Sequence, residues 1–117
     1  MKLRSIALAS LFVLALAGAG SAAARPSAAH ARIVKVTAKD FSFVVSPKTV
    51  HHGRVTFVIK NTGATDHDFA IAGHVSKKVA PGKTVRMTVT LKKGHSSYRC
   101  TVDSHAQMGM KGILDVT

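Results

Sequence analysis

Three side chains that bind soft metal ions lie within eleven residues of one another near the end of the chain. Cys100 offers a thiolate, His105 an imidazole, and Met108 or Met110 a thioether. Sulfur and imidazole donors together suit copper. Two histidines, one cysteine and a weakly bound methionine form the copper sites that transfer single electrons. This segment supplies one imidazole, so the second has to come from elsewhere in the chain.

His67 is the histidine that we expect to complete this donor set. It stands in a loop that follows one expected strand and precedes another, much as Cys100 and His105 do. His51 and His52 are adjacent, and adjacent side chains of a strand point to opposite faces, so that pair does not form a site. The remaining histidines of the domain are expected to be solvated.

The N-terminal segment has the order of a secretory signal peptide. Basic residues come first, an apolar run follows over residues 6–17, and small residues come after it. The run is shorter than the roughly 20 residues that a membrane-spanning helix needs, which favours cleavage over retention as an anchor. Small-x-small patterns predict cleavage after Ala24 or after Ala31. We therefore expect residues 1–31 to be a signal peptide and short leader, and the protein to be periplasmic, extracellular or held in the cell envelope.

Cys100 is the only cysteine of the 117-residue chain. Small exported domains use cysteines in pairs, as disulfides. This thiol has no partner within the chain, so burial or a metal has to protect it. A buried apolar role is the simpler explanation for one cysteine alone. Four soft or borderline donors at this spacing nevertheless favour a metal site.

The domain expected after cleavage is strongly basic. Of 17 Lys and Arg residues, Lys2, Arg4 and Arg25 lie in the segment to be removed, so residues 32–117 keep 14 basic against 5 acidic side chains. A formal charge of about +9 favours partners with an acidic docking surface and speeds their encounter. Nucleic-acid binding is not predicted, because few aromatic residues accompany the lysines to form a stacking surface.

The elements that position the donors are expected to be β-strands. Beyond residue 31 the apolar residues alternate with a period of two, turn residues interrupt them at short intervals, and no helical periodicity is present. This pattern predicts one all-β domain at residues 32–117, a Greek-key sandwich or barrel of about seven strands. The expected strands are residues 33–38, 41–45, 55–60, 68–72, 84–91, 96–100 and 112–117.

Two motifs in this order resemble those of the cupredoxins, in particular plastocyanin- and azurin-like proteins. Residues 61–69 have the pattern Asn-x-Gly-x-x-x-His-Asp-Phe, and residues 98–116 have the pattern Tyr-x-Cys-x4-His-x4-Met-x-Gly-x-Leu-x-Val. The resemblance covers residues 33–117. It implies a cupredoxin-like sandwich that binds one type 1 copper ion, alternating between Cu(I) and Cu(II).

The resemblance also implies a role for each donor. His67 matches the upstream histidine ligand, Cys100 the thiolate ligand, and His105 the downstream histidine ligand near the surface. In the family, the axial methionine is followed two positions later by glycine as the last strand begins. Met110 fits that pattern and is the expected axial ligand, with Met108 as the alternative, because both spacings from the histidine occur among cupredoxins.

Asp68 and Thr101 are expected to connect the two ligand loops. In the resembling proteins the residue after the upstream histidine has this role. We therefore predict a hydrogen bond from the Thr101 backbone or hydroxyl to Asp68, and a backbone N–H of Asp68 directed at the Cys100 sulfur. The chain departs from the family at Asp68, often asparagine, and at Asp103-Ser104, often Pro-Gly. These departures bear on loop rigidity and reduction potential more than on copper binding.

These expectations define a soluble, monomeric electron carrier and not an enzyme, since no acid–base pair or substrate motif accompanies the donors. An apolar rim around the downstream histidine, with Ala106 and Met108 as candidates, would face the redox partner. A copper chaperone or storage protein without fast electron transfer is the first alternative. A metal-free Ig-like interaction domain is the second.

Overall fold

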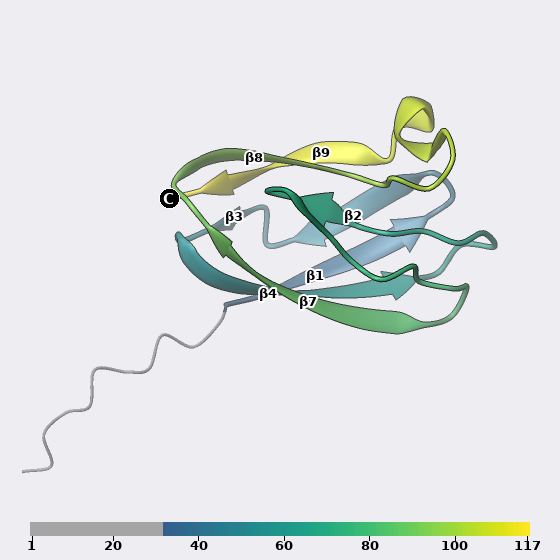
Figure 1. The fold of residues 1–117 in the computed structure, drawn as a ribbon, viewed down its shortest axis with the longest axis horizontal. Coiled ribbons are helices and arrows are strands. Elements are labelled where there is room, and N and C mark those ends of the chain that lie inside the picture. Colours follow the sequence, from purple (N-terminus) through teal and green to yellow (C-terminus); the bar gives the residue numbers. More distant parts are fainter. Residues whose placement is uncertain (1–31) are drawn as a thin grey trace, which may run out of the picture.

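Two β-sheets pack face to face in the part of the chain that the computed structural model describes, residues 32–117 (Figure 1). The segment expected to be a signal peptide, with both cleavage sites, lies outside the described residues. In residues 32–117 no helix is long and apolar enough to cross a membrane.

The first sheet has the order β2-β1-β4-β7. Its pairs are antiparallel except β1 and β4, which run parallel with Ala38 opposite Asn61. Parallel neighbours end at the same edge of a sheet, so the turn after β1 and the loop after β4 lie side by side. The strand bounds are β1 Arg32–Lys39, β2 Ser42–Ser46, β4 Gly53–Asn61 and β7 Thr84–Leu91.

The second sheet has the order β3-β9-β8-β5-β6. A single turn of 3-10 helix, η1, connects β8 to β9 at the end of the sandwich away from the C-terminus (Figure 1). The bounds are β3 Thr49–Val50, β5 Ala70–Ile71, β6 His74–Val75, β8 Gly94–Arg99, η1 His105–Met108 and β9 Lys111–Val116.

The alternating residues of the long strands form the core between the sheets. Val55, Phe57 and Ile59 of β4 are fully buried, while the residues between them are partly exposed. Across the core, the Phe57 ring packs at 5.1 Å from the ring of Phe69. Each such buried side chain stabilises the fold by roughly 1.5–3 kcal/mol. The period of two therefore places one face of each sheet inside.

The predicted all-β Greek-key sandwich is confirmed, and each of the seven expected strands is present. Three elements were not predicted: β3, β6 and η1. Each is two to four residues long, too short to carry a periodic pattern, and β3 and β6 exist only by pairing with β9 and β5. The strand expected at 68–72 is limited to Ala70–Ile71, because Asp68 and Phe69 belong to the loop after β4 and Ala72 begins the turn to β6.

Candidate metal centre

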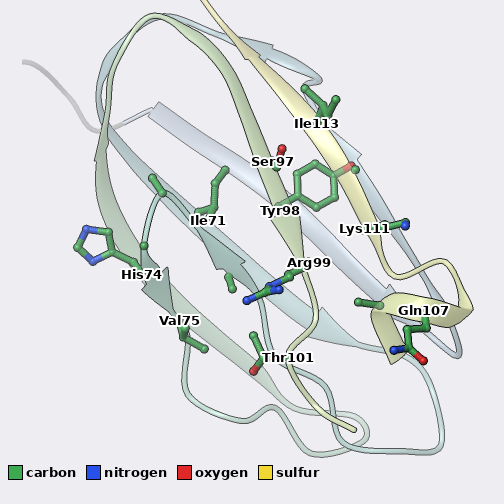
Figure 2. A pocket seen from close by; sticks show the side chains of 15 residues that line it. Ile71, His74, Val75, Ser97, Tyr98, Arg99, Thr101, Gln107, Lys111 and Ile113 are labelled. Atoms are coloured by element: carbon green, nitrogen blue, oxygen red, sulfur yellow. The ribbon is translucent and has the colours of Figure 1, made fainter. Parts of the chain in front are cut away.

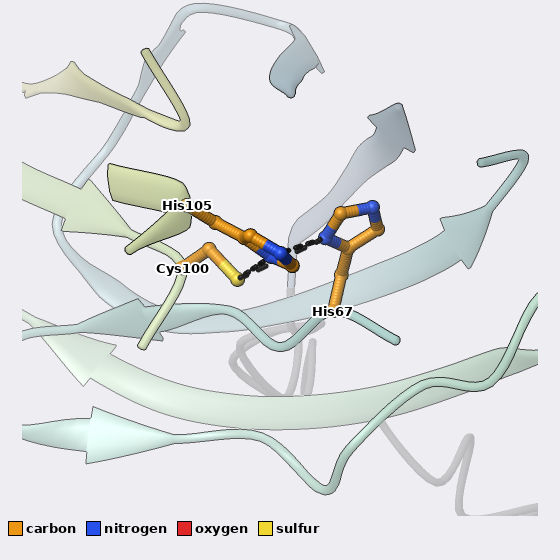
Figure 3. A group of neighbouring side chains, drawn as sticks. All are labelled: His67, Cys100 and His105. Atoms are coloured by element: carbon orange, nitrogen blue, oxygen red, sulfur yellow. Dashed lines mark hydrogen bonds between the residues drawn. The ribbon is translucent and has the colours of Figure 1, made fainter. Parts of the chain in front are cut away.

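Three potential donor atoms, from His67, Cys100 and His105, lie close together inside the sandwich (Figure 3). His67 Nδ1 lies 3.2 Å from His105 Nδ1 and 3.9 Å from Cys100 Sγ, and His105 Nδ1 lies 3.7 Å from Cys100 Sγ. All three residues are buried. Within residues 32–117 they form the only group of histidine, cysteine or acidic side chains compact enough to hold a metal ion.

At this spacing the three atoms would be able to bind one metal ion together. Metal–imidazole bonds of about 2.0–2.1 Å and metal–thiolate bonds of about 2.3 Å, at about 120° to one another, separate the nitrogens by about 3.5 Å and each nitrogen from sulfur by about 3.8 Å. The observed separations agree with these values to within about 0.4 Å. One thiolate and two imidazoles in this arrangement suit copper.

The upstream loop places His67 through backbone and amide contacts. The His67 N–H donates to the Val79 carbonyl at 3.1 Å, and the Val79 N–H donates back at 2.7 Å. Asn61, the last residue of β4, is fully buried. Its side-chain amide donates to the carbonyls of Thr65 at 2.7 Å and Val79 at 2.8 Å and accepts from the Gly63 N–H at 2.8 Å. The asparagine of the first motif therefore shapes the loop from inside.

Asp40, in the turn after β1, contacts the other side of the His67 ring. Its Oδ1 accepts hydrogen bonds from His67 Nε2 at 2.7 Å and Thr65 Oγ1 at 2.9 Å, and its Oδ2 accepts from the Ala64 N–H at 2.8 Å. The bond from Ala64 is the main cause that lowers the pKa of Asp40 to about 2, and the bonds from His67 and Thr65 act in the same direction against partial desolvation.

Sequence reasoning missed Asp40. The available signal was a rare acidic residue between two expected strands in a chain with only five acidic side chains. That signal does not say which loop the carboxylate contacts. The parallel pairing of β1 with β4 brings Asp40 next to the loop that contains His67, and this pairing is not visible in the sequence.

The downstream loop is closed largely by its own backbone. The Cys100 N–H donates to the Met110 carbonyl at 3.0 Å, and the Met110 N–H donates to the His105 carbonyl at 3.2 Å. The His105 N–H in turn donates to the Val102 carbonyl at 3.2 Å. After η1, Gly109 adopts φ 117°, a left-handed conformation that favours glycine. Cys100, His105 and Met110 are thus arranged by one short, self-bonded segment.

His105 was expected near the surface, and its exposed fraction is 6%. The ring of Phe41 lies against it, with ring centroids 4.7 Å apart. Phe41 also meets the His67 ring edge-on at 6.2 Å. The turn that contains Asp40 therefore supplies an apolar cover over both imidazoles.

The two candidate methionines have opposite environments. Met110 is 0% exposed and belongs to a buried cluster with Cys100 and Ala38. Met108 is 58% exposed at the end of η1. Only Met110 therefore shares the interior with the thiol.

Gly112, two residues after Met110, makes room for Tyr98 on the neighbouring strand. A Cβ at Gly112 would lie 2.3 Å from the Tyr98 hydroxyl oxygen. The Tyr98 ring packs at 5.3 Å from the ring of Phe69 and 5.9 Å from that of Phe43. The glycine of the Met-x-Gly pattern is thus explained by packing, because a side chain at position 112 would clash with Tyr98.

The hydrogen bonds predicted between Asp68 and Thr101 are confirmed. The Thr101 N–H donates to Asp68 Oδ1 at 2.6 Å, and the Thr101 hydroxyl donates to Asp68 Oδ2. Burial raises the pKa of the Cys100 thiol, and hydrogen bonds from the backbone N–H groups of Asp68 and Val102 act in the opposite direction. Asp68 therefore connects the upstream loop to the segment that carries the thiol.

Other histidines of the described domain lie away from this cluster. His95 Nδ1 contacts Asp115 Oδ1 at 2.6 Å, and His52 Nδ1 contacts the Thr117 carbonyl at 2.9 Å. His51 and His74 are also exposed.

Comparison with family models identifies the family of the chain. The model of the cupredoxin-like domain matches residues 5–114, so the chain belongs to the cupredoxin-like family. None of the curated proteins compared matches the chain.

Solved structures show the same fold at low sequence identity. Reduced auracyanin from the photosynthetic bacterium Roseiflexus castenholzii is 20% identical with a TM-score of 0.65, over 74% of this chain and 98% of that one. Auracyanin A, a blue copper protein from Chloroflexus aurantiacus, is 21% identical with a TM-score of 0.62, over 73% and 98% of the two chains. The blue copper oxidase of Nitrosomonas europaea is 17% identical with a TM-score of 0.58, over 73% of this chain but 38% of the oxidase.

Proposed function

We propose that this protein is a type 1 copper protein that carries single electrons between redox partners outside the cytoplasm. The observation that carries the proposal is the buried trio of His67 Nδ1, Cys100 Sγ and His105 Nδ1, all within 3.9 Å of one another. These three residues are the proposed strong ligands. Met110, buried beside Cys100, is the proposed axial ligand, and exposed Met108 is not.

The chain's own residues supply what such a carrier needs. Bound copper would take up and release one electron by alternating between Cu(I) and Cu(II). Hydrogen bonds hold both histidines and the cysteine to loops at the end of a packed sandwich, so the donor positions change little between the two states. The burial of all three donors excludes water, which lowers the reorganisation that each electron transfer requires.

The visible spectrum of the copper-loaded protein tests this proposal. A carrier should show an intense thiolate-to-copper band that disappears on reduction and returns on oxidation. A Cys100→Ser variant, which removes the thiolate in place, should lose the band. A chaperone or storage protein would bind Cu(I) and stay colourless, and a metal-free interaction domain would bind no copper. Either result would contradict the proposal.

The proposed partner is a redox protein with an acidic docking surface. A groove runs along the outer face of β5, β6, β8 and β9 to η1 (Figure 2), and within the described residues no carboxylate lines it. Arg99 and Lys111 stand directly opposite each other on β8 and β9 at this groove. Like charges in that position destabilise a sheet. An acidic partner would relieve this repulsion close to Cys100.

Reaction with ferricyanide, an anionic oxidant, tests the charge of this face. Arg99→Glu should slow the second-order oxidation of the reduced protein and weaken its dependence on ionic strength. Lys93→Glu makes the same change of net charge just before β8, at the opposite end of that strand from Arg99. Equal slowing by both variants would mean that net charge, and not this face, steers the encounter.

The proposed mature form is residues 32–117, or a form that begins after Ala24, in the periplasm, the cell envelope or the medium. The mass and N-terminal sequence of the protein recovered from the cell envelope and medium test this. Retention of Met1 in membrane-bound protein would instead indicate an uncleaved anchor.

A further inference from the structure

The His67 ring is held at both nitrogens by different partners. Nδ1 faces the thiol and the second imidazole, while Nε2 faces Asp40 Oδ1 at 2.7 Å. A carboxylate has only acceptor atoms. The proton of a neutral His67 ring therefore sits on Nε2, and the lone pair that can bind a metal sits on Nδ1.

The upstream loop is shaped around this carboxylate. Asp40 Oδ1 and Oδ2 accept three hydrogen bonds from the loop, from Ala64, Thr65 and His67. A Cβ at Gly63 would lie 2.3 Å from Asp40 Oδ1 and 2.8 Å from its Cγ. The loop thus has a glycine, with no side chain, at the place where the Asp40 carboxyl group lies. This close fit is independent of the bond to the histidine ring.

We propose that Asp40 is a positioning residue that selects Nδ1 of His67 as the ligating nitrogen and, by accepting the Nε2 proton in a charge-assisted hydrogen bond, favours Cu(II) over Cu(I). This inference rests on the proposed copper function and deepens it. A carboxylate that accepts the second N–H of a ligating histidine orients the ring and raises its basicity. A more basic imidazole stabilises the more highly charged ion, so the bond lowers the reduction potential.

The experiment compares Asp40→Asn with wild type. Asparagine has nearly the same shape and can still accept from Nε2, but it carries no charge. Asp66→Asn is the matched control. Asp66 is exposed and directly precedes His67, so this substitution removes the same charge from a nearby position. The readouts are the reduction potential, the Cu(II) and Cu(I) affinities, and the tautomer of His67 in the metal-free protein from nitrogen NMR shifts.

We expect Asp40→Asn to lower Cu(II) affinity about 10–100-fold and Cu(I) affinity less. Each tenfold loss of Cu(II) affinity relative to Cu(I) affinity raises the potential by about 59 mV. Asp66→Asn should leave the potential close to that of wild type. An unchanged potential in folded Asp40→Asn would overturn the proposal. An equal shift in Asp66→Asn would also overturn it, because the effect would then come from charge alone.

The tautomer measurement needs no variant and no copper. Wild-type, metal-free protein should show the proton of a neutral His67 ring on Nε2, whereas a proton on Nδ1 would overturn the proposal even if Asp40→Asn failed to fold. A wild-type protein that binds no copper but has the Nε2–H tautomer would count against the proposed function and leave the hydrogen-bond assignment standing. The two failures are therefore distinguishable.

Discussion

The two loops that carry the proposed donors are held in place by different kinds of contact. The downstream loop, residues 100–110, closes through backbone hydrogen bonds between its own members, such as Cys100 to Met110 and His105 to Val102. The upstream loop, residues 62–69, depends on groups distant in sequence, among them Asp40 and Val79. Local spacing alone can therefore specify three of the proposed donors, whereas the fourth, His67, takes its place only when the sheet is assembled.

Loss of the buried amide of Asn61 should have the largest effect. Asn61→Ala removes three side-chain hydrogen bonds, so the Thr65 and Val79 carbonyls each lose one donor and the Gly63 N–H loses its acceptor. We expect a loss of roughly 3 kcal/mol in the free energy of unfolding, together with weaker metal binding, measured by denaturant titration. Exposed Lys60→Ala, next to it on β4, should change stability by less than about 0.5 kcal/mol. A similar loss in both variants would contradict the special role of this loop.

Replacement of Met110 tests the downstream loop at its buried end. Met110→Gln should keep copper, because three strong ligands remain, but should change the visible spectrum and lower the potential by about 59 mV or more, a tenfold change in the affinity ratio. The reason is that an amide oxygen is a harder donor than a thioether and favours Cu(II). Met108→Gln is the matched control and should change neither property. If Met108 controlled the spectrum instead, the axial assignment would be reversed.

A substitution at the turn after η1 should have a smaller effect. Gly109→Ala adds a Cβ at φ 117°, where the nearest atom, the Phe41 carbonyl oxygen, would be 3.5 Å away. The space is sufficient, so the expected loss of about 1–2 kcal/mol comes from the backbone conformation alone. Thermal unfolding measures it, with exposed Gln107→Ala as the control on η1. No loss in Gly109→Ala would mean that the loop adapts more freely than its hydrogen bonds indicate.

The β5–β6 hairpin, which carries no proposed ligand, provides the smallest test. Its two turn residues, Ala72 and Gly73, both have positive φ, 50° and 77°. This is the turn type that favours Asn-Gly. Ala72→Asn should therefore stabilise the fold by about 0.5–1 kcal/mol without changing the spectrum or potential of the copper-loaded protein. A spectral change would show that this hairpin and the metal site are coupled.

The parts of the candidate site that could be predicted are those with a local pattern. The distance in sequence from Cys100 to His105 and Met110 is set by one short loop, and the alternating strands on either side identify it as a loop. The contact between Asp68 and Thr101 followed from the resemblance to a family in which the two loops are joined. Asp40 has no such pattern, because its spacing from His67 reflects the length of three strands, β2, β3 and β4, and their connections.

The sequence by itself determined the all-β class, the long strands, the family and the residues proposed as donors, because periodicity, donor chemistry and loop spacing are properties of neighbouring residues. Tertiary structure alone decided three other things: the parallel pairing of β1 with β4, the burial of Met110 with exposure of Met108, and the carboxylate of Asp40 behind His67. These depend on which strands become neighbours when their apolar faces are buried together, and that choice is made by the whole core at once.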